Sequence, residues 1–342
     1  MADIAKLVDE LGGMAQKRQL VRRGATDWDL TRAYQSRQVI RARNGWYSTM
    51  PADSPPVRAV RVGGRLTGIS ALIEWGAWVE KPHPLHVSVK ENAARLRTQQ
   101  NRRVRFNPEQ PAGVIVHWDD SDITQPGTAV SVGLSDALYR VIVDEELEVA
   151  VACLDWAIHS RRLDYADFVA LVARLPEAYR YIAGWIDFAC ESLPESLVRT
   201  RARLRGHRVT SQIRIVTNER IDLAVDDIAG IEVDGEATHV NTFEKDRAKD
   251  VEATIAGFHA LRPSARMVFN SFDRFYLALV TALAARSTPP VFDPTEIQAI
   301  ARAGEAKASE FRHPPTRLQR KSLNFRSRRG RGGNTSSTRE LD

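Results

Sequence analysis

Two short β-prone runs near the C-terminal end hold carboxylates between apolar neighbours, and this pattern constrains the fold most. Residues 220–225 include Asp222, and residues 230–234 include Glu232 and Asp234. Successive side chains of a strand point to opposite faces, so Glu232 and Asp234 share a face and Asp222 can lie across from them. Gathered carboxylates repel one another and lose hydration, so folding alone gives no reason to gather them. A divalent cation such as Mg²⁺ or Mn²⁺ gives one, because it takes oxygen ligands.

The residues around these runs predict a small α/β module over residues 191–290. Apolar periodicity and turn residues indicate the order helix, three strands, helix, strand and helix. The expected helices are 195–205, 243–258 and 272–285, and the expected strands are 212–216, 220–225, 230–234 and 266–269. A surface ladder is the alternative for the acids, with Glu232 and Asp234 in solvent and Asp222 at a strand edge.

Five short motifs follow one another in this segment. They are Glu195-Ser196 with Arg199, then Ile221-Asp222-Leu223, then Glu232-Val233-Asp234-Gly235, then His239, and finally Asp246-Arg247 with Asp250. In this order and spacing the segment resembles the PD-(D/E)xK nuclease superfamily, in the branch similar to the very-short-patch-repair endonucleases. The resemblance spans about residues 190–290 and implies a restriction-endonuclease-like core.

The resemblance also implies a metal-dependent reaction on phosphodiesters. Asp222 and Glu232 would be ligands of Mg²⁺ or Mn²⁺, with Asp234 a third ligand or a support for the other two. His239 would move protons or assist the leaving group. The complete set of catalytic candidates is Glu195, Gln212, Asp222, Glu232, Asp234 and His239.

The chain departs from the superfamily pattern in one respect that bears on activity. The lysine expected two residues after the second acid is replaced by Asp234. Lys249, on the following helix, is a candidate substitute, although a surface lysine is the simpler interpretation. Beside an active nuclease, the pattern therefore also fits a domain that keeps the fold, has lost catalysis and only binds.

The first 50 residues predict three helices followed by a β-hairpin. Ile4, Leu7, Val8 and Leu11 mark the inner face of the first helix, and residues 15–23 form the second. Thr26 begins the third helix, with Asp29 three residues later in a capping-box pattern. The hairpin covers residues 39–48 and turns at Asn44-Gly45. This is the winged helix-turn-helix plan.

On this plan the third helix enters the major groove of DNA. Its outward side offers Trp28, Arg32, Gln35 and Arg37, and the hairpin offers Arg41 and Arg43 for the phosphate backbone or the minor groove. A three-helix protein-interaction module with solvated arginines is the alternative.

The same segment has two motifs that match a known family. Residues 12–24 read GGMAQKRQLVRRG and residues 39–48 read VIRARNGWYS. They resemble the winged-helix N-terminal domain of AbiEi-type abortive-infection antitoxins, over about residues 1–90. The resemblance implies DNA binding, repression of the protein's own operon in a toxin–antitoxin or phage-defence setting, and a possible toxin partner or neighbouring gene product.

The middle of the chain, residues 51–190, offers no catalytic pattern. A Pro-rich stretch precedes short helices and two strands, and residues 135–190 are helical in pattern. His83, His86 and His117 have no carboxylate or cysteine at ligand spacing, so we interpret them as packing or surface histidines. Cys153 and Cys190 are expected to be buried free thiols.

The net charge of +6 is concentrated at the end of the chain. Residues 311–342 carry nine Lys and Arg against two acids. This stretch, part of a basic tail over residues 300–342, is poor in apolar residues and predicts disorder, with nucleic-acid contact or simple solubility as its role. The chain shows no secretory signal and no membrane span, and its two cysteines fit a reducing compartment, so we expect a cytoplasmic protein.

Together these patterns predict a multidomain α+β protein. The expected parts are a winged helix-turn-helix at 1–50, a mixed middle region at 51–190, an endonuclease-like core at 191–290 and the basic tail. The leading hypothesis is a DNA-binding protein with a metal-dependent endonuclease domain. The alternative is an AbiEi-type antitoxin or transcriptional regulator whose nuclease-like domain is inactive.

Overall fold

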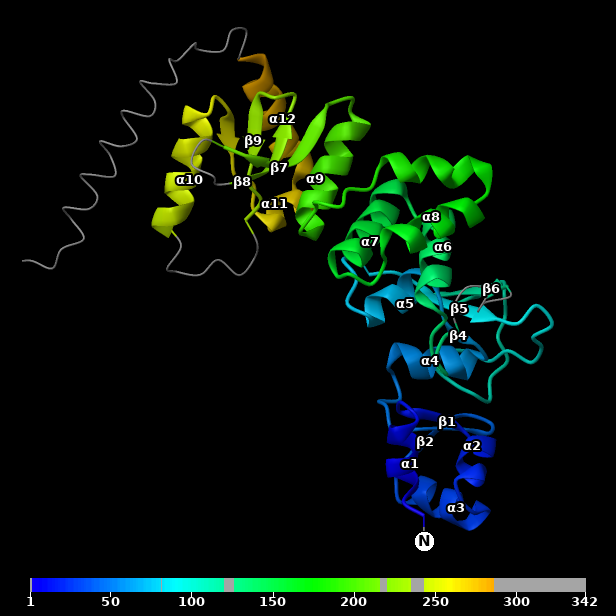
Figure 1. The fold of residues 1–342 in the computed structure, drawn as a ribbon. Coiled ribbons are helices and arrows are strands. Elements are labelled where there is room, and N and C mark those ends of the chain that lie inside the picture. The colour runs from blue at the N-terminus through cyan, green and yellow to red at the C-terminus, as the bar shows by residue number, and fades with distance from the viewer. Residues whose placement is uncertain (1, 81, 120–125, 216–219, 235–242, 286–342) are drawn as a thin grey trace, which may run out of the picture. The chain divides into compact units, whose positions relative to one another are not determined.

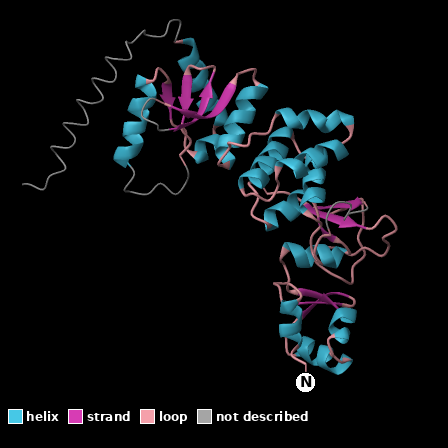
Figure 2. Ribbon diagram, viewed as in Figure 1, coloured by secondary structure: helices cyan, strands magenta, loops and turns pink. Residues whose placement is uncertain are grey.

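A computed structural model describes residues 2–80, 82–119, 126–215, 220–234 and 243–285. Helices and strands are interspersed along these residues, as an α+β protein requires, and the strands form three separate sheets (Figure 2). Within the described residues, no helix has the length and apolar character that crossing a bilayer demands.

The first three helices and three strands form a small N-terminal unit. Thr26 and Asp29 make the expected capping box at the start of the third helix. The strands pair in an antiparallel sheet of order β1-β3-β2, and β1 was not expected from the sequence. The elements are α1 (Ile4–Glu10), β1 (Met14–Gln16), α2 (Lys17–Arg22), α3 (Asp27–Gln35), β2 (Ile40–Arg43) and β3 (Trp46–Ser48).

The middle of the chain builds the largest apolar core around a three-stranded sheet and a group of helices. Strand β5 pairs parallel with β6 and antiparallel with β4. Cys153 and Cys190 are buried and free, as expected. The elements are α4 (Pro55–Val62), β4 (Arg65–Leu66), α5 (Gly68–Glu74), β5 (Leu85–Val89), β6 (Val114–Trp118), α6 (Leu134–Asp144), α7 (Leu147–His159), α8 (Tyr165–Arg174) and the 3-10 helix η1 (Glu177–Gly184).

The C-terminal module contains a four-stranded sheet of order β10-β9-β8-β7. Strands β7, β8 and β9 form an antiparallel meander, and β10 joins β9 in parallel. The parallel pair needs a crossover connection, and α10 lies in it. The elements are α9 (Leu193–Leu204), β7 (Val209–Arg214), β8 (Arg220–Val225), β9 (Ala229–Ile231), α10 (Phe243–Ile255), β10 (His259–Leu261), α11 (Ala265–Asn270) and α12 (Phe272–Ala284).

The fourth strand of this sheet differs from the sequence prediction. Residues 266–269 belong to helix α11, whereas the strand is His259–Leu261. Pro263 precedes Ser264, whose hydroxyl caps the helix by accepting from the backbone N–H of Met267. The run of three apolar residues, Met267-Val268-Phe269, does not by itself distinguish helix from strand, so the cap decides the outcome.

Two apolar clusters cover the C-terminal sheet. Helices α9, α11 and α12 pack with Leu223, Val225 and Ile231 in one cluster. Helix α10 contributes Ala253 to a second cluster with Ile215 and Ile221. Figure 1 shows α10 and α9 on opposite sides of the sheet. Asp222 of β8 and Glu232, which directly follows β9, therefore lie at a sheet that helices cover from both sides.

Buried polar contacts join helix α9 to the middle of the chain. Asp155 of α7 is fully buried and accepts hydrogen bonds from the Ser196 hydroxyl and the Arg199 guanidinium, both at 2.6 Å. Arg201 pairs with Glu148 at 2.8 Å. The Ser and Arg of the Glu195-Ser196 motif therefore anchor the helix that carries Glu195.

Candidate functional site

Asp222 and Glu232 face each other across neighbouring strands. Leu223 pairs with Ile231 in the antiparallel β8–β9 ladder, which makes Asp222 and Glu232 the next pair along it. The backbone N–H of Asp222 donates to Glu232 Oε1 at 3.2 Å, and the N–H of Val233 donates to Asp222 Oδ2 at 2.9 Å. Two of the predicted acids are therefore brought together at the point where β9 ends.

Glu195 lies beside this pair, in the first turn of α9. Its Oε1 accepts from the hydroxyl of the N-cap residue Ser192 at 2.6 Å, and its Oε2 accepts from Gln212 Nε2 at 3.3 Å. Gln212 adopts a left-handed backbone (φ 53°) within β7, a conformation that costs free energy for a residue with a side chain. The fold holds Gln212 in this conformation, and its amide donates to the carboxylate of Glu195.

Burial dominates the electrostatics of these carboxylates. It raises the pKa of Glu195 to about 7, and the negative charge of Asp222 adds to the effect. It also raises the pKa of Glu232 to about 7, again reinforced by Asp222. The pKa of Asp222 is raised by burial as well. The site therefore concentrates carboxyl oxygens that a positive charge would favour in their ionised form.

One cation of the chain already lies at this position. Lys249 of α10 places its Nζ 2.5 Å from Glu232 Oε2, with only 20% of its side chain exposed. Its charge also lowers the pKa of Asp222 against the effect of burial. Lys249 is therefore a partly buried member of the acidic site, and the simpler interpretation of a surface lysine is wrong.

Asp234 points its carboxylate at a different partner. Its Oδ1 accepts from Arg262 Nη1 at 2.9 Å, and Arg262 also binds Asp250 at 2.9 Å. Backbone bonds from Asp234 N–H to Pro263 and from Ala265 N–H to Asp234 fix the segment beside β10. Of the two roles considered for Asp234, ligand or support, this ion pair favours support.

Two further observations qualify the predicted metal site. His239 lies outside the described residues. Among those that are described, the side chains whose ligand atoms lie within 4.8 Å of one another are His86, His117 and Asp144, in the middle of the chain. Asp222, Glu232 and Asp234 are not gathered as closely as that group.

The outward side of α3 carries the side chains expected to read DNA. Arg32, Gln35 and Arg37 are exposed, and the Arg32 guanidinium lies 5.2 Å from the centre of the Trp28 ring, which is 60% exposed. Arg37 adopts a left-handed conformation (φ 60°) just after the helix. These positively charged and aromatic groups form an exposed face suited to a polyanion.

The two hairpin arginines are used within the chain. Arg43 donates from Nη1 to the carbonyls of Arg61 and Val62 and from Nη2 to the carbonyl of Arg95. Arg41 donates to the Tyr47 hydroxyl and lies over the Tyr47 ring. Arg43 is therefore no longer expected to contact DNA, because its guanidinium donates to three carbonyls of the chain.

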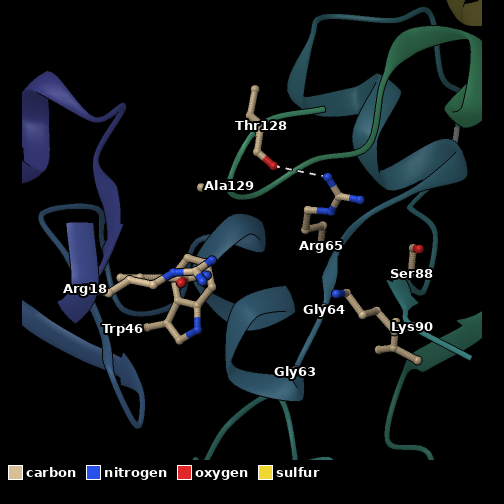
Figure 3. A pocket seen from close by; sticks show the side chains of 11 residues that line it. Arg18, Trp46, Gly63, Gly64, Arg65, Ser88, Lys90, Thr128 and Ala129 are labelled. Carbon is tan, nitrogen blue, oxygen red and sulfur yellow. Dashed lines mark hydrogen bonds between the residues drawn. The ribbon is translucent and has the colours of Figure 1, made fainter. Parts of the chain in front are cut away.

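A cavity of about 360 Å³ lies beside the N-terminal sheet (Figure 3). Arg18 and Trp46 line it together with Arg65 and Lys90, and Arg65 donates to the carbonyl of Thr128 at 3.4 Å. Close backbone approach shapes it, because a Cβ at Gly64 would lie 2.0 Å from the carbonyl oxygen of Ser88. Sequence reasoning missed this group, since the residues that line the cavity come from five separate segments.

The histidine–aspartate group was missed for the same reason, and the sequence indicates Lys249 only as an alternative to a surface lysine. Helix α10 brings Lys249 to Glu232, and helix α6 brings Asp144 to the histidines. Neither approach leaves a short motif in the sequence. The chain matches no protein-family model, and a search of curated proteins finds no relative.

Proposed function

We propose that this protein binds DNA and that its C-terminal module hydrolyses phosphodiester bonds with Mg²⁺ or Mn²⁺. The observation that carries the proposal is the position of Glu232, whose carboxylate accepts from the backbone N–H of Asp222 and pairs with the ammonium of Lys249. Two acids and a lysine at the end of a β-hairpin are the elements that the PD-(D/E)xK resemblance calls for, with the lysine supplied by α10.

The residues at this site fit a hard divalent cation. Asp222 and Glu232 offer carboxylate oxygens on adjacent strands, with Glu195 beside them. Burial leaves all three with a raised pKa, and a bound cation would reverse that shift by favouring the ionised carboxylates. The cation would supply polarisation of the phosphoryl group and a lowered pKa for the attacking water.

The remaining side chains would position the reactants. Lys249 would hold the attacking water or a phosphoryl oxygen once the cation takes over the neutralisation of Glu232. Gln212 would keep Glu195 oriented through its hydrogen bond. Asp234 would act indirectly, by holding Arg262 against Asp250 near the start of α11.

The N-terminal unit would hold the DNA. Its order of helices and strands, with α3 exposed and followed by a β-hairpin, supports a winged helix-turn-helix. Arg32, Gln35 and Arg37 would contact the duplex from α3. Arg18 and Lys90 at the cavity would add contacts to the phosphate backbone.

Plasmid cleavage tests the catalytic part of the proposal. The full chain is incubated with supercoiled plasmid and Mg²⁺ or Mn²⁺, and nicked and linear products are followed with time. Asp222→Asn should abolish cleavage, because it removes a ligand at nearly constant shape. Asp273→Asn, an exposed aspartate on α12, is the matched control and should cleave like the wild type.

The same assay separates the outcomes. Cleavage that persists unchanged in Asp222→Asn would mean a contaminating nuclease or another site, and the proposal would be abandoned. A wild-type protein that binds plasmid without cutting it in either metal would leave only the binding function.

That second outcome corresponds to an AbiEi-type antitoxin or transcriptional regulator. The exposed face of α3 favours it, since this surface does not depend on the acidic site. It predicts sequence-specific binding to the protein's own promoter, with a toxin encoded nearby as partner. If a variant with alanine at Arg32, Gln35 and Arg37 shifts promoter DNA as well as the wild type, this function is excluded.

A further inference from the structure

Two histidines of the middle sheet lie on one face of adjacent parallel strands. The β5–β6 register places His86 opposite Ile115 and Ser88 opposite His117. Side chains two residues apart on a strand share a face, so His86 and His117 project to the same side. Helix α6 ends at Asp144 beside them. Strands β5 and β6 and helix α6, labelled in Figure 1, therefore meet at these three side chains.

The three side chains bring their ligand atoms to the spacing that a small metal ion requires. His117 Nε2 lies 3.2 Å from His86 Nδ1 and 3.6 Å from Asp144 Oδ2, and His86 Nδ1 lies 3.9 Å from Asp144 Oδ2. Ligand atoms about 2.0–2.1 Å from a tetrahedral zinc ion are roughly 3.3 Å apart. Small movements of these side chains would complete the coordination.

The donor atoms of the group suit a transition metal. His86 and His117 are largely shielded from solvent, with 3% and 9% of their side chains exposed, and an uncharged imidazole has a free electron pair for a metal. Arg140 donates to Asp144 Oδ1 at 3.3 Å, which leaves Oδ2 towards the histidines. Two imidazoles and one carboxylate form a ligand set that zinc uses with a fourth position open.

Residues around the group provide the support that metal ligands usually have. Glu145 Oε1 lies 3.7 Å from His86 Nε2, and Glu145 Oε2 lies 3.4 Å from His83 Nδ1. A carboxylate next to the second nitrogen of a ligating histidine orients the ring and increases its basicity. The side chain of His86 is only 3% exposed, whereas that of Asp144 is 21% exposed and gives an ion access.

We propose that His86, His117 and Asp144 bind a zinc-type divalent ion with three protein ligands. The site is separate from the acidic residues of the C-terminal module, and it does not depend on the proposed nuclease. The ion would connect β5, β6 and α6, and its fourth position would hold water or a small ligand.

Metal content of the full chain tests the proposal. The protein is treated with EDTA, incubated with Zn²⁺, passed over a desalting column and analysed for metal. We expect about one tightly held zinc per chain, and at least about tenfold weaker binding in both His117→Gln and Asp144→Asn. The Asp144 variant changes a partly exposed side chain, so it remains informative if a histidine variant fails to fold.

Control variants identify which site holds the metal. His159→Gln changes an exposed histidine of α7, and Asp222→Asn changes the C-terminal acids; both should keep the zinc. Co²⁺ in place of Zn²⁺ should give the intense visible absorption of a tetrahedral ion, and this absorption should be lost in Asp144→Asn. A wild-type protein that retains no zinc, or zinc that stays in both ligand variants, would overturn the proposal and leave a hydrogen-bonded histidine pair.

Discussion

Lys249 Nζ lies 2.5 Å from Glu232 Oε2, so a helix supplies the cation that the strand lacks. The residue two positions after Glu232 is Asp234, and its carboxylate is paired with Arg262. The strand therefore offers no ammonium group to the site, whereas α10 does. If the proposed nuclease function holds, Lys249 would take the role of the lysine that the resemblance expects two residues after the second acid.

Replacing Lys249 by Met should reduce plasmid cleavage by about 100-fold, in line with the usual cost of removing one positioned group that stabilises charge in the transition state. Mn²⁺ binding should survive, because Asp222 and Glu232 remain. Cleavage time courses and a Mn²⁺ thermal-shift titration measure the two effects.

Arg266→Met removes an exposed cation from α11 and should leave cleavage unchanged. Equal cleavage by Lys249→Met and wild type would show that Lys249 only neutralises Glu232 in the metal-free protein.

Glu195 should make stability depend on pH. Its pKa is about 7 in the folded protein, against an ordinary value of 4.5, because burial favours the neutral carboxyl. Between pH 4.5 and 7 the folded state therefore binds more protons than the unfolded state, and the free energy of unfolding contributed by Glu195 falls as pH rises. Below about pH 4.5 that contribution is fully present, and above about pH 7 it is lost.

The difference in unfolding free energy between Glu195→Gln and wild type isolates this effect. In EDTA, the unfolding free energy of Glu195→Gln relative to that of the wild type should rise by up to about 3 kcal/mol between pH 4.5 and 7. Urea titrations at several pH values measure it. Glu177→Gln, at an exposed carboxylate on η1, should show no such change. If the difference in unfolding free energy between Glu195→Gln and wild type does not change with pH, then folding does not raise the pKa of Glu195.

Local sequence patterns were sufficient for the elements that caps and turns define. The Thr26–Asp29 capping box and the turn at Asn44-Gly45 lie where they were predicted. Alternation within residues 220–225 also gave the right strand and placed Asp222 across from Glu232. These features depend on neighbours a few residues apart, which the sequence displays directly.

Features that depend on distant segments could not be predicted in the same way. Lys249 is 17 positions from Glu232, and His117 is 31 positions from His86. The sequence predicts that Arg43 is an exposed arginine of the hairpin. In the structure its guanidinium donates to the carbonyl of the distant Arg95. In each case, packing of separate elements decides whether a charged or polar side chain faces solvent, a partner or a candidate metal site.

The ion pair between Asp155 and Arg199 should be essential for the position of α9. Asp155 is fully buried and its side chain binds both Arg199 and Ser196. Asp155→Ala would remove the nearer counter-charge of the buried guanidinium and leave Asp187 Oδ2 at 3.8 Å from its Nε, so we expect a loss of about 3 kcal/mol in unfolding free energy. Urea denaturation measures this loss.

Asp164→Ala, at the exposed N-cap of α8, is the comparison and should cost only about 1 kcal/mol. A loss for Asp155→Ala no larger than that of the cap variant would show that α9 is held mainly by apolar packing. If the loss of this ion pair displaces α9, Glu195 moves with the helix. Asp155→Ala should then lower plasmid cleavage as well as the free energy of unfolding.

Arginines of the N-terminal unit should fall into two groups that one pair of measurements separates. Arg37 is exposed next to α3, so Arg37→Ala should weaken DNA binding and reduce the salt dependence of the logarithm of affinity by about 1, as loss of one phosphate contact does. Arg43 binds three carbonyls within the chain, so Arg43→Ala should cost about 2 kcal/mol of unfolding free energy. Gel shifts at several salt concentrations and urea titrations measure both variants. If Arg43→Ala leaves stability unchanged and removes a phosphate contact, then the carbonyl bonds give way to DNA, and the hairpin belongs to the DNA-binding surface after all.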